Sequence, residues 1–157
     1  MKKAITVILI ACAIIIFVFP MFSCNTANGN RMKEINKACG VNFSDVINDD
    51  DVLNFEKDGF YVYAKLSVND NEVDKIIERL KDCGYYKNDL KNKDVQDKSF
   101  LSWWDAESIE NSSTYIMTSS RDGDNGATCP TLTEIHFCDT NGDNTLVYIA
   151  YYKWTFV

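Results

Sequence analysis

The only histidine, His136, is the first residue to consider as a catalytic base. It follows Glu134 by two positions in the segment TLTEIHFC, and residues two apart on a strand share a face. Glu134 could therefore orient the imidazole, which would activate a hydroxyl or thiol nucleophile. Nothing else in the sequence completes a triad, and it lacks P-loop, GxGxxG, HExxH and GxSxG motifs. We therefore expect His136 to be an exposed strand residue, assign no catalytic residue and predict a protein that is not an enzyme.

A calcium site is suggested by Asp139, Asn141 and Asp143, which are spaced like the first ligands of an EF-hand loop. That loop also needs glycine at its sixth position and a bidentate acid at its twelfth, where this chain has Asn144 and Ala150. A hairpin turn explains the pattern better. A zinc site is disfavoured because the chain has no CxxC pair and one histidine. We predict no metal and no cofactor.

The segment SWWD contains the residues that we single out as binding candidates, Trp103, Trp104 and Asp105. Adjacent residues of an extended chain point to opposite sides. One tryptophan is therefore expected in the core, and the other is free to be exposed. Exposed aromatic rings stack on sugars or anchor protein partners. The competing interpretation is that both tryptophans pack in the core.

Four cysteines, Cys39, Cys83, Cys129 and Cys138, lie in the body of the chain. An even number in an exported domain suggests two disulfides. If residues 131–138 form a strand, the extended chain between Cys129 and Cys138 spans about 30 Å, whereas bridged Cα atoms lie about 4.4–6.8 Å apart. This excludes that pair unless the chain bends, and we prefer Cys39–Cys138 with Cys83–Cys129. The alternative is four reduced, buried thiols.

The first 23 residues are typical of an export signal or membrane anchor, because Lys2 and Lys3 precede a long apolar run. Cys24 follows, as in a bacterial lipoprotein signal that is cleaved and acylated at that cysteine. Phe22 departs from the small residue usual at its position. A single N-terminal transmembrane anchor and free secretion are the alternatives. All three place the domain outside the cytoplasm, since the positive end stays inside, and residues 24–30 are a flexible tether.

Residues 31–157 are predicted to form one α+β domain, since their number suits a single core. A short helix is expected over Arg31–Cys39, and the main amphipathic helix over 70–83, with Cys83 directed toward the core. Residues 85–100 are expected to be a loop. Strands are expected at 60–67, 114–119, 131–138 and 145–157, with a further candidate at 52–56.

These elements predict a single antiparallel sheet of about four to five strands, packed against the main helix on one face. The last strand is apolar on both of its faces, with Tyr148 and Ala150 on one and Val147 and Ile149 on the other. We therefore expect it to be central in the sheet.

The body of the chain also resembles a family of small uncharacterised exported lipoproteins from Firmicutes-type bacteria. The matching pieces are Gly59, Tyr63 and Lys65 in a G-x-x-x-Y-x-K strand, the acidic helix 70–83, the segment Trp103, Trp104 and Asp105, and the aromatic hairpin from Tyr148 to Trp154. The resemblance implies the same fold and an extracytoplasmic location. It brings no activity with it.

Charge limits the choice of partners. Without the first 23 residues, the chain has 14 basic and 23 acidic side chains, a net charge of −9. We expect no nucleic acid partner and membrane contact only through the N-terminus. The leading hypothesis is a membrane-tethered, non-catalytic binding or envelope-structural module with a protein or glycan partner. The alternative is a small acidic inhibitor- or immunity-type protein that blocks a partner enzyme. A hydrolase using His136 is the third hypothesis.

Overall fold

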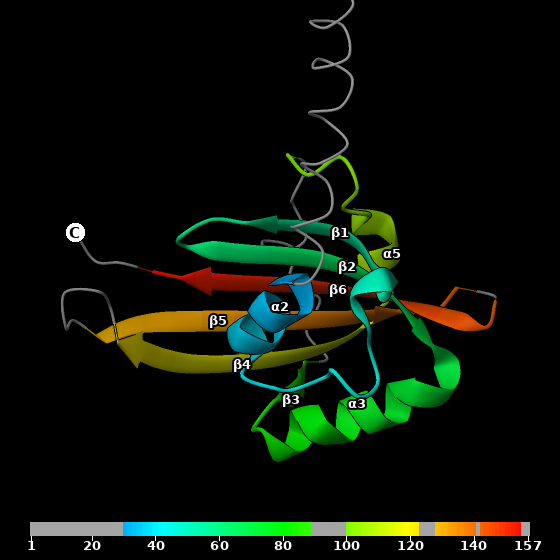
Figure 1. Ribbon diagram of the computed structural model, residues 1–157, viewed down its shortest axis with the longest axis horizontal. Helices are drawn as coiled ribbons and strands as arrows, with labels where there is room; N and C mark the ends of the chain where they lie inside the picture. Colours follow the sequence, from blue (N-terminus) through cyan, green and yellow to red (C-terminus); the bar gives the residue numbers. More distant parts are fainter. Residues whose placement is uncertain (1–29, 89–99, 123–127, 141, 155–157) are drawn as a thin grey trace, which may run out of the picture.

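The computed structural model describes residues 30–88, 100–122, 128–140 and 142–154. They form one six-stranded antiparallel sheet in the order β1-β2-β6-β5-β4-β3 (Figure 1). The elements are α2 (Arg31–Cys39), η2 (Asp49–Asp51), β1 (Val52–Lys57), β2 (Tyr61–Asn69), α3 (Asp70–Asp82), β3 (Tyr86–Asn88), α5 (Ala106–Glu110), β4 (Ser113–Asp122), β5 (Thr128–Cys138) and β6 (Asn144–Lys153). The α+β class is confirmed, with more strands than expected.

The last strand, β6, lies in the middle of the sheet between β2 and β5 (Figure 1). It pairs with both neighbours along nearly its whole length. Val147 and Ile149 are buried on one face of the sheet, and Tyr148 and Ala150 are buried on the other. The prediction of a central last strand with two covered faces is confirmed.

The unexpected strand is β3, at the edge of the sheet. Its three residues pair with β4 within a segment that was expected to be a loop. Three residues are too few to show an alternating pattern, so the pairing depends on the neighbouring strand. The remainder of that expected loop, residues 89–99, lies outside the described residues.

Helices α2 and α3 cover one face of the sheet (Figure 1). In α2, Met32, Ile35 and Cys39 recur at helical spacing and are all buried. Gly40 then adopts a left-handed conformation with φ of 68° and ends the helix as predicted. The core beneath the two helices also contains Phe43, Ala64, Leu66, Ile76, Leu80, Tyr115, Ile135, Phe137, Val147 and Ile149.

Helix α3 has a defined beginning and end. The Asn69 side chain accepts a hydrogen bond of 3.0 Å from the Asn71 backbone N–H at its start. Gly84, with φ of 90°, turns the chain after its end. Cys83 is exposed, so its predicted direction toward the core was wrong. The helix ends at Asp82, and Cys83 has therefore left the apolar stripe that contains Leu80.

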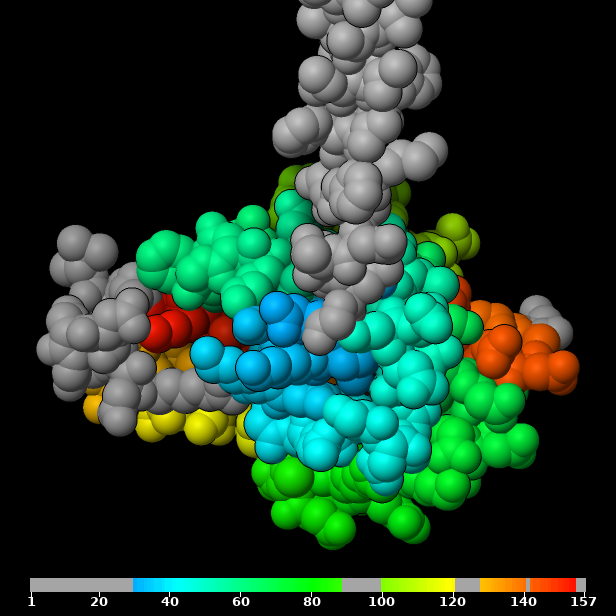
Figure 2. Space-filling view, viewed as in Figure 1, coloured from blue at the N-terminus to red at the C-terminus, as the bar shows by residue number. Residues whose placement is uncertain are grey.

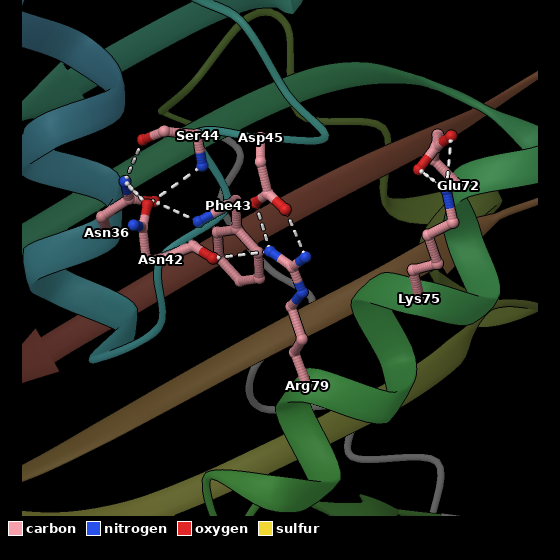
Figure 3. Close-up of polar contacts among 8 residues, drawn as sticks. All are labelled: Asn36, Asn42, Phe43, Ser44, Asp45, Glu72, Lys75 and Arg79. Carbon is pink, nitrogen blue, oxygen red and sulfur yellow. Dashed lines mark hydrogen bonds and ion pairs between the residues drawn. The ribbon is translucent and has the colours of Figure 1, made fainter.

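A polar network joins α2, the loop that follows it and α3 (Figure 3). The Asn36 side chain accepts from the Phe43 backbone N–H at 3.1 Å and donates to Ser44 Oγ at 2.9 Å. Arg79 of α3 reaches the same loop and forms a two-pronged ion pair with Asp45. The hydrogen bonds from Arg79 lower the pKa of the Asp45 carboxyl to about 2.

The opposite face of the sheet is covered by residues 100–110, which include α5. Leu101 and Ile109 are buried there against Tyr148. A helical layer was expected on one face only. The sheet instead has an apolar cluster on each face, because β2 and β6 both carry large side chains on their second face.

None of the four described cysteines is bridged. Cys39 belongs to the core under α2, whereas Cys138 belongs to the cluster on the opposite face. The sheet therefore separates the first predicted pair. In the second, Cys83 is exposed and Cys129 is buried. The structure holds neither predicted disulfide.

The predicted membrane attachment lies outside the described residues. Residues 1–29 contain the signal or anchor, Cys24 and all but the last residue of the tether. In the part of the chain that the structure describes, no helix is long and apolar enough to cross a membrane. Acylation of Cys24 stays a prediction.

Candidate functional site

The candidate site is the sheet face beneath α5, which we call the α5 face. Tyr63 of β2 pairs with Ala150 of β6, which pairs in turn with Glu134 of β5. Directly paired residues of antiparallel strands share a face. The same register places Tyr61, Lys65, His136, Cys138, Tyr148 and Tyr152 on the α5 face.

Trp104 lies at the centre of the α5 face. Its ring contacts Tyr63, Tyr148 and His136 edge-on, with centroid separations of 6.0, 5.3 and 6.2 Å. These values fall within the range that aromatic contacts favour. Its side chain is only 8% exposed. Trp104 is therefore a packing residue of this face.

Trp103 is half-buried and reaches the surface beside Trp104, with a ring separation of 5.9 Å. The pair belongs to a turn, because the Trp104 backbone N–H donates to the Leu101 carbonyl at 3.0 Å. Trp104 thus lies in the core, and Trp103 is half-buried at its margin. A turn separates them, where an extended strand was assumed.

Asp105 has a structural task at the start of α5. Its carboxylate accepts hydrogen bonds from the Ser108 backbone N–H at 3.1 Å and from the Ser108 hydroxyl at 2.6 Å. These bonds lower the pKa of Asp105, and the nearby Lys65 ammonium adds to that effect. Asp105 is therefore an ionised N-cap at the margin of the α5 face.

His136 and Glu134 share the α5 face as expected, but they are 3% and 1% exposed. The imidazole Nδ1 lies 2.9 Å from Thr114 Oγ1, and Trp104 contacts the ring edge-on. The expectation of an exposed histidine was wrong, because residues 100–110 pack over β5. The structure places His136 in the interior of the face.

The Tyr148 phenol and the Cys138 thiol in this interior are held uncharged at neutral pH. Burial raises the pKa of Tyr148 and of Cys138 to about 12, and the Asp105 carboxylate adds to both shifts. Burial also raises the pKa of Tyr152. Trp104 Nε1 and the Tyr148 hydroxyl are buried with no hydrogen-bond partner among the described residues. A buried phenol or thiol that stays protonated does not act as a nucleophile at neutral pH.

The outer part of the α5 face is a surface of five rings, which we call the aromatic patch: Tyr61, Phe100, Trp103, Tyr152 and Trp154. Tyr61, Tyr152 and Phe100 surround the buried Tyr63 ring, with centroids 4.8, 5.6 and 5.7 Å from it. Trp154 extends the surface by stacking on Tyr152, at 6.5 Å and 14°. Phe100 is 64% exposed and Trp154 is 47% exposed. Contiguous exposed apolar surface marks interaction sites.

Sequence reasoning found Trp103 of this patch and missed the other four rings as binding residues. Alternation is visible in both β2 and β6, but that of β6 was interpreted as the packing of a central strand covered on both faces. Phe100 stood in the expected loop. The signal that could have found the patch was the excess of aromatic over aliphatic residues on one face of these two strands.

A hollow of about 480 Å³ lies on the other side of the molecule, between α2 and residues 42–49, where blue and cyan atoms meet in Figure 2. Its walls include Lys33, Asn36 and Asp49. The Asn36 amide is engaged by the loop, and Asp49 Oδ1 accepts from the Met32 backbone N–H at 2.8 Å. Its polar groups therefore serve the fold.

No cluster of three or more metal-ligating side chains occurs among the described residues. Comparison of the chain with protein-family models, with curated proteins and with solved structures finds no match. The function is therefore inferred from the geometry of the aromatic patch.

Proposed function

We propose that this protein is a membrane-tethered, extracytoplasmic binding module whose aromatic patch engages a protein or glycan partner. The observation that carries the proposal is the patch itself. The rings of Tyr61 from β2, of Phe100 and of Tyr152 from β6 converge on Tyr63. Rings held in place by a packed sheet lose little conformational entropy on binding.

The α5 face favours binding over catalysis. His136 and Glu134 are buried beneath Trp104, so the catalytic hypothesis lacks an accessible base at these two residues. Tyr148 and Cys138 remain protonated at neutral pH because burial raises their pKa values to about 12. The exposed rings of Phe100 and Trp154 on this face supply contact area.

Attachment to the membrane is the second part of the proposal. The basic head, the apolar run and Cys24 support a lipid-anchored form on the outer face of the cell membrane. Metabolic labelling with a fatty-acid analogue should mark the wild-type chain and leave Cys24→Ala unlabelled. An unlabelled wild type would exclude the lipid and leave the transmembrane anchor or secretion.

An inhibitor- or immunity-type protein is the second candidate, favoured by the exposed Trp154 ring at the end of β6. A ring that stacks on Tyr152 and projects from a sheet can fill the groove of a partner enzyme. Such a protein should copurify with one enzyme at a one-to-one ratio and suppress its activity. A purified complex with full enzyme activity would contradict this alternative.

The binding proposal is tested with the full-length chain in mild detergent, mixed with envelope fragments from the producing cells. The wild type should sediment with the fragments, and Trp154→Ala should remain in solution. Leu53→Ala is the matched control, because Leu53 is also about half exposed, at 48%, but lies on the edge strand β1. Equal retention of wild type and Trp154→Ala, with unchanged melting, would refute a role for the patch.

A further inference from the structure

We infer that the aromatic patch binds a basic protein segment, with Arg or Lys side chains against its rings and its carboxylates at the margins. This inference rests on the proposed function and names the chemistry of the partner. It follows from the distribution of charge on the α5 face, from a cation already bound to a ring there, and from the orientation of the rings.

Acidic groups stand beside the patch. Glu56 of β1 is exposed and pairs directly with Tyr63, so it lies on the α5 face next to the ring on which the patch converges. Burial raises the pKa of Tyr63, and the charges of Glu56 and Glu134 add to that rise, which shows that both acids are close. Asp105 occupies another margin, with the exposed Glu107 and Glu110 of α5 near it.

Basic groups are scarce on the same face. Strand register places Lys57, Lys87 and Lys153 on the α2 side of the sheet, opposite Val62, Tyr115 and Thr131. Among the described strand residues whose side chains are placed, Lys65 is the only lysine or arginine on the α5 face. An approaching cation therefore meets more carboxylates than ammonium groups. The chain after its first 23 residues has a net charge of −9, which adds a long-range attraction for cations.

The face already holds one cation against a ring. The Lys65 Nζ lies over the Tyr148 ring, 5.1 Å from its centroid, within the distance of a cation–π contact. Asp105 is close enough to this ammonium for Lys65 to lower its pKa. Lys65 thus has a ring and a counter-charge within the protein, which leaves Glu56 and the exposed rings for a partner.

The rings also suit planar cations. Tyr152 and Trp154 lie nearly parallel, whereas most contacts around Tyr63 are edge-on. A guanidinium group stacks on an aromatic face and can pair with a carboxylate at the same time. A neutral glycan would use the rings but would gain no charge attraction from Glu56. An anionic polymer would be repelled by it.

The test measures binding of a fluorescent peptide of alternating arginine and glycine to the full-length chain in mild detergent, by anisotropy. Trp154→Ala and Glu56→Gln should each weaken binding about two- to fivefold, as expected for one exposed cation–π contact or ion pair. Matched controls are Leu53→Ala and Glu78→Gln, the latter an exposed acid on α3. Raising salt from about 0.1 M to about 1 M should weaken binding, because the Debye length falls from about 10 to about 3 Å.

Each other outcome has a defined meaning. If Glu78→Gln weakens peptide binding as much as Glu56→Gln does, binding depends on net charge alone and the inference fails. If the peptide does not bind, or Trp154→Ala leaves its affinity unchanged, the inference also fails. The envelope assay then separates the two ideas. Retention that Trp154→Ala abolishes keeps the binding module and points to a glycan or neutral partner, whereas retention unaffected by Trp154→Ala removes both.

Discussion

Replacing Trp104 by alanine should destabilise the domain strongly, whereas the same change at Trp103 should not. Trp104 is 8% exposed and contacts the rings of Tyr63, Tyr148 and His136. Removing a buried tryptophan typically costs about 3–5 kcal/mol of unfolding free energy. This is a large part of the about 5–15 kcal/mol that holds a domain together. Trp103 is half-buried, and its loss should cost about 1 kcal/mol, the centre of the range for point substitutions.

A third variant, Trp104→Phe, separates ring packing from the indole N–H. Trp104 Nε1 has no hydrogen-bond partner among the described residues, and a buried donor of that kind costs about 1–3 kcal/mol. Removing it offsets part of the lost contact, so Trp104→Phe should be much less destabilising than Trp104→Ala.

The assay is urea unfolding of the full-length chain in mild detergent, followed by far-UV circular dichroism because the substitutions remove a fluorophore. The slope of unfolding free energy against urea should stay constant across the variants. An unfolding free energy of Trp104→Ala within about 1 kcal/mol of that of Trp103→Ala would refute the assignment of Trp104 to the core.

Three further predictions concern the Asp45–Arg79 ion pair, the accessibility of two cysteines and the left-handed glycine after α3. Asp45→Asn should lower the urea midpoint at neutral pH. The difference from wild type should vanish as the pH falls from 3.8 to about 2, because Arg79 lowers the pKa of Asp45 in the folded state across that window. A difference that persists below pH 2 would contradict this. Mass spectrometry should find Cys83 labelled by a maleimide in the native chain and Cys138, with a pKa of about 12, labelled only after unfolding. Gly84→Ala should cost about 1–2 kcal/mol in a thermal melt, because its φ of 90° disfavours a side chain, and an unchanged melt would count against that conformation.

Elements with long periodic patterns could be predicted from the sequence. Helix α2 ends before Gly40, which adopts the left-handed conformation that terminates it. Strand β6, which is apolar on both faces, lies at the centre of the sheet. In these cases the local pattern and the tertiary environment agree. The fold class followed from them without information from distant parts of the chain.

The features that were missed depend on contacts between distant segments. His136 was expected at the surface because nothing in the sequence completes a catalytic triad around it, but residues 100–110 bury it. Cys39 and Cys138 are separated by the sheet, which only the strand register reveals. The aromatic patch likewise draws Phe100 and Trp154 from segments far apart in the chain. Neither hydrophobic periodicity nor residue spacing contains that information.

The central position of β6 has a consequence for the order in which the sheet can form. Its residues, Asn144–Lys153, are hydrogen-bonded to β2 on one side and to β5 on the other. A polypeptide that leaves the ribosome with its N-terminus first cannot join β2 to β5 until this strand has emerged. Because so many of its pairings are distant in sequence, folding should also be slow. The sheet order thus leaves the β1–β2 pair unconnected to strands β5, β4 and β3 until the last strand is available.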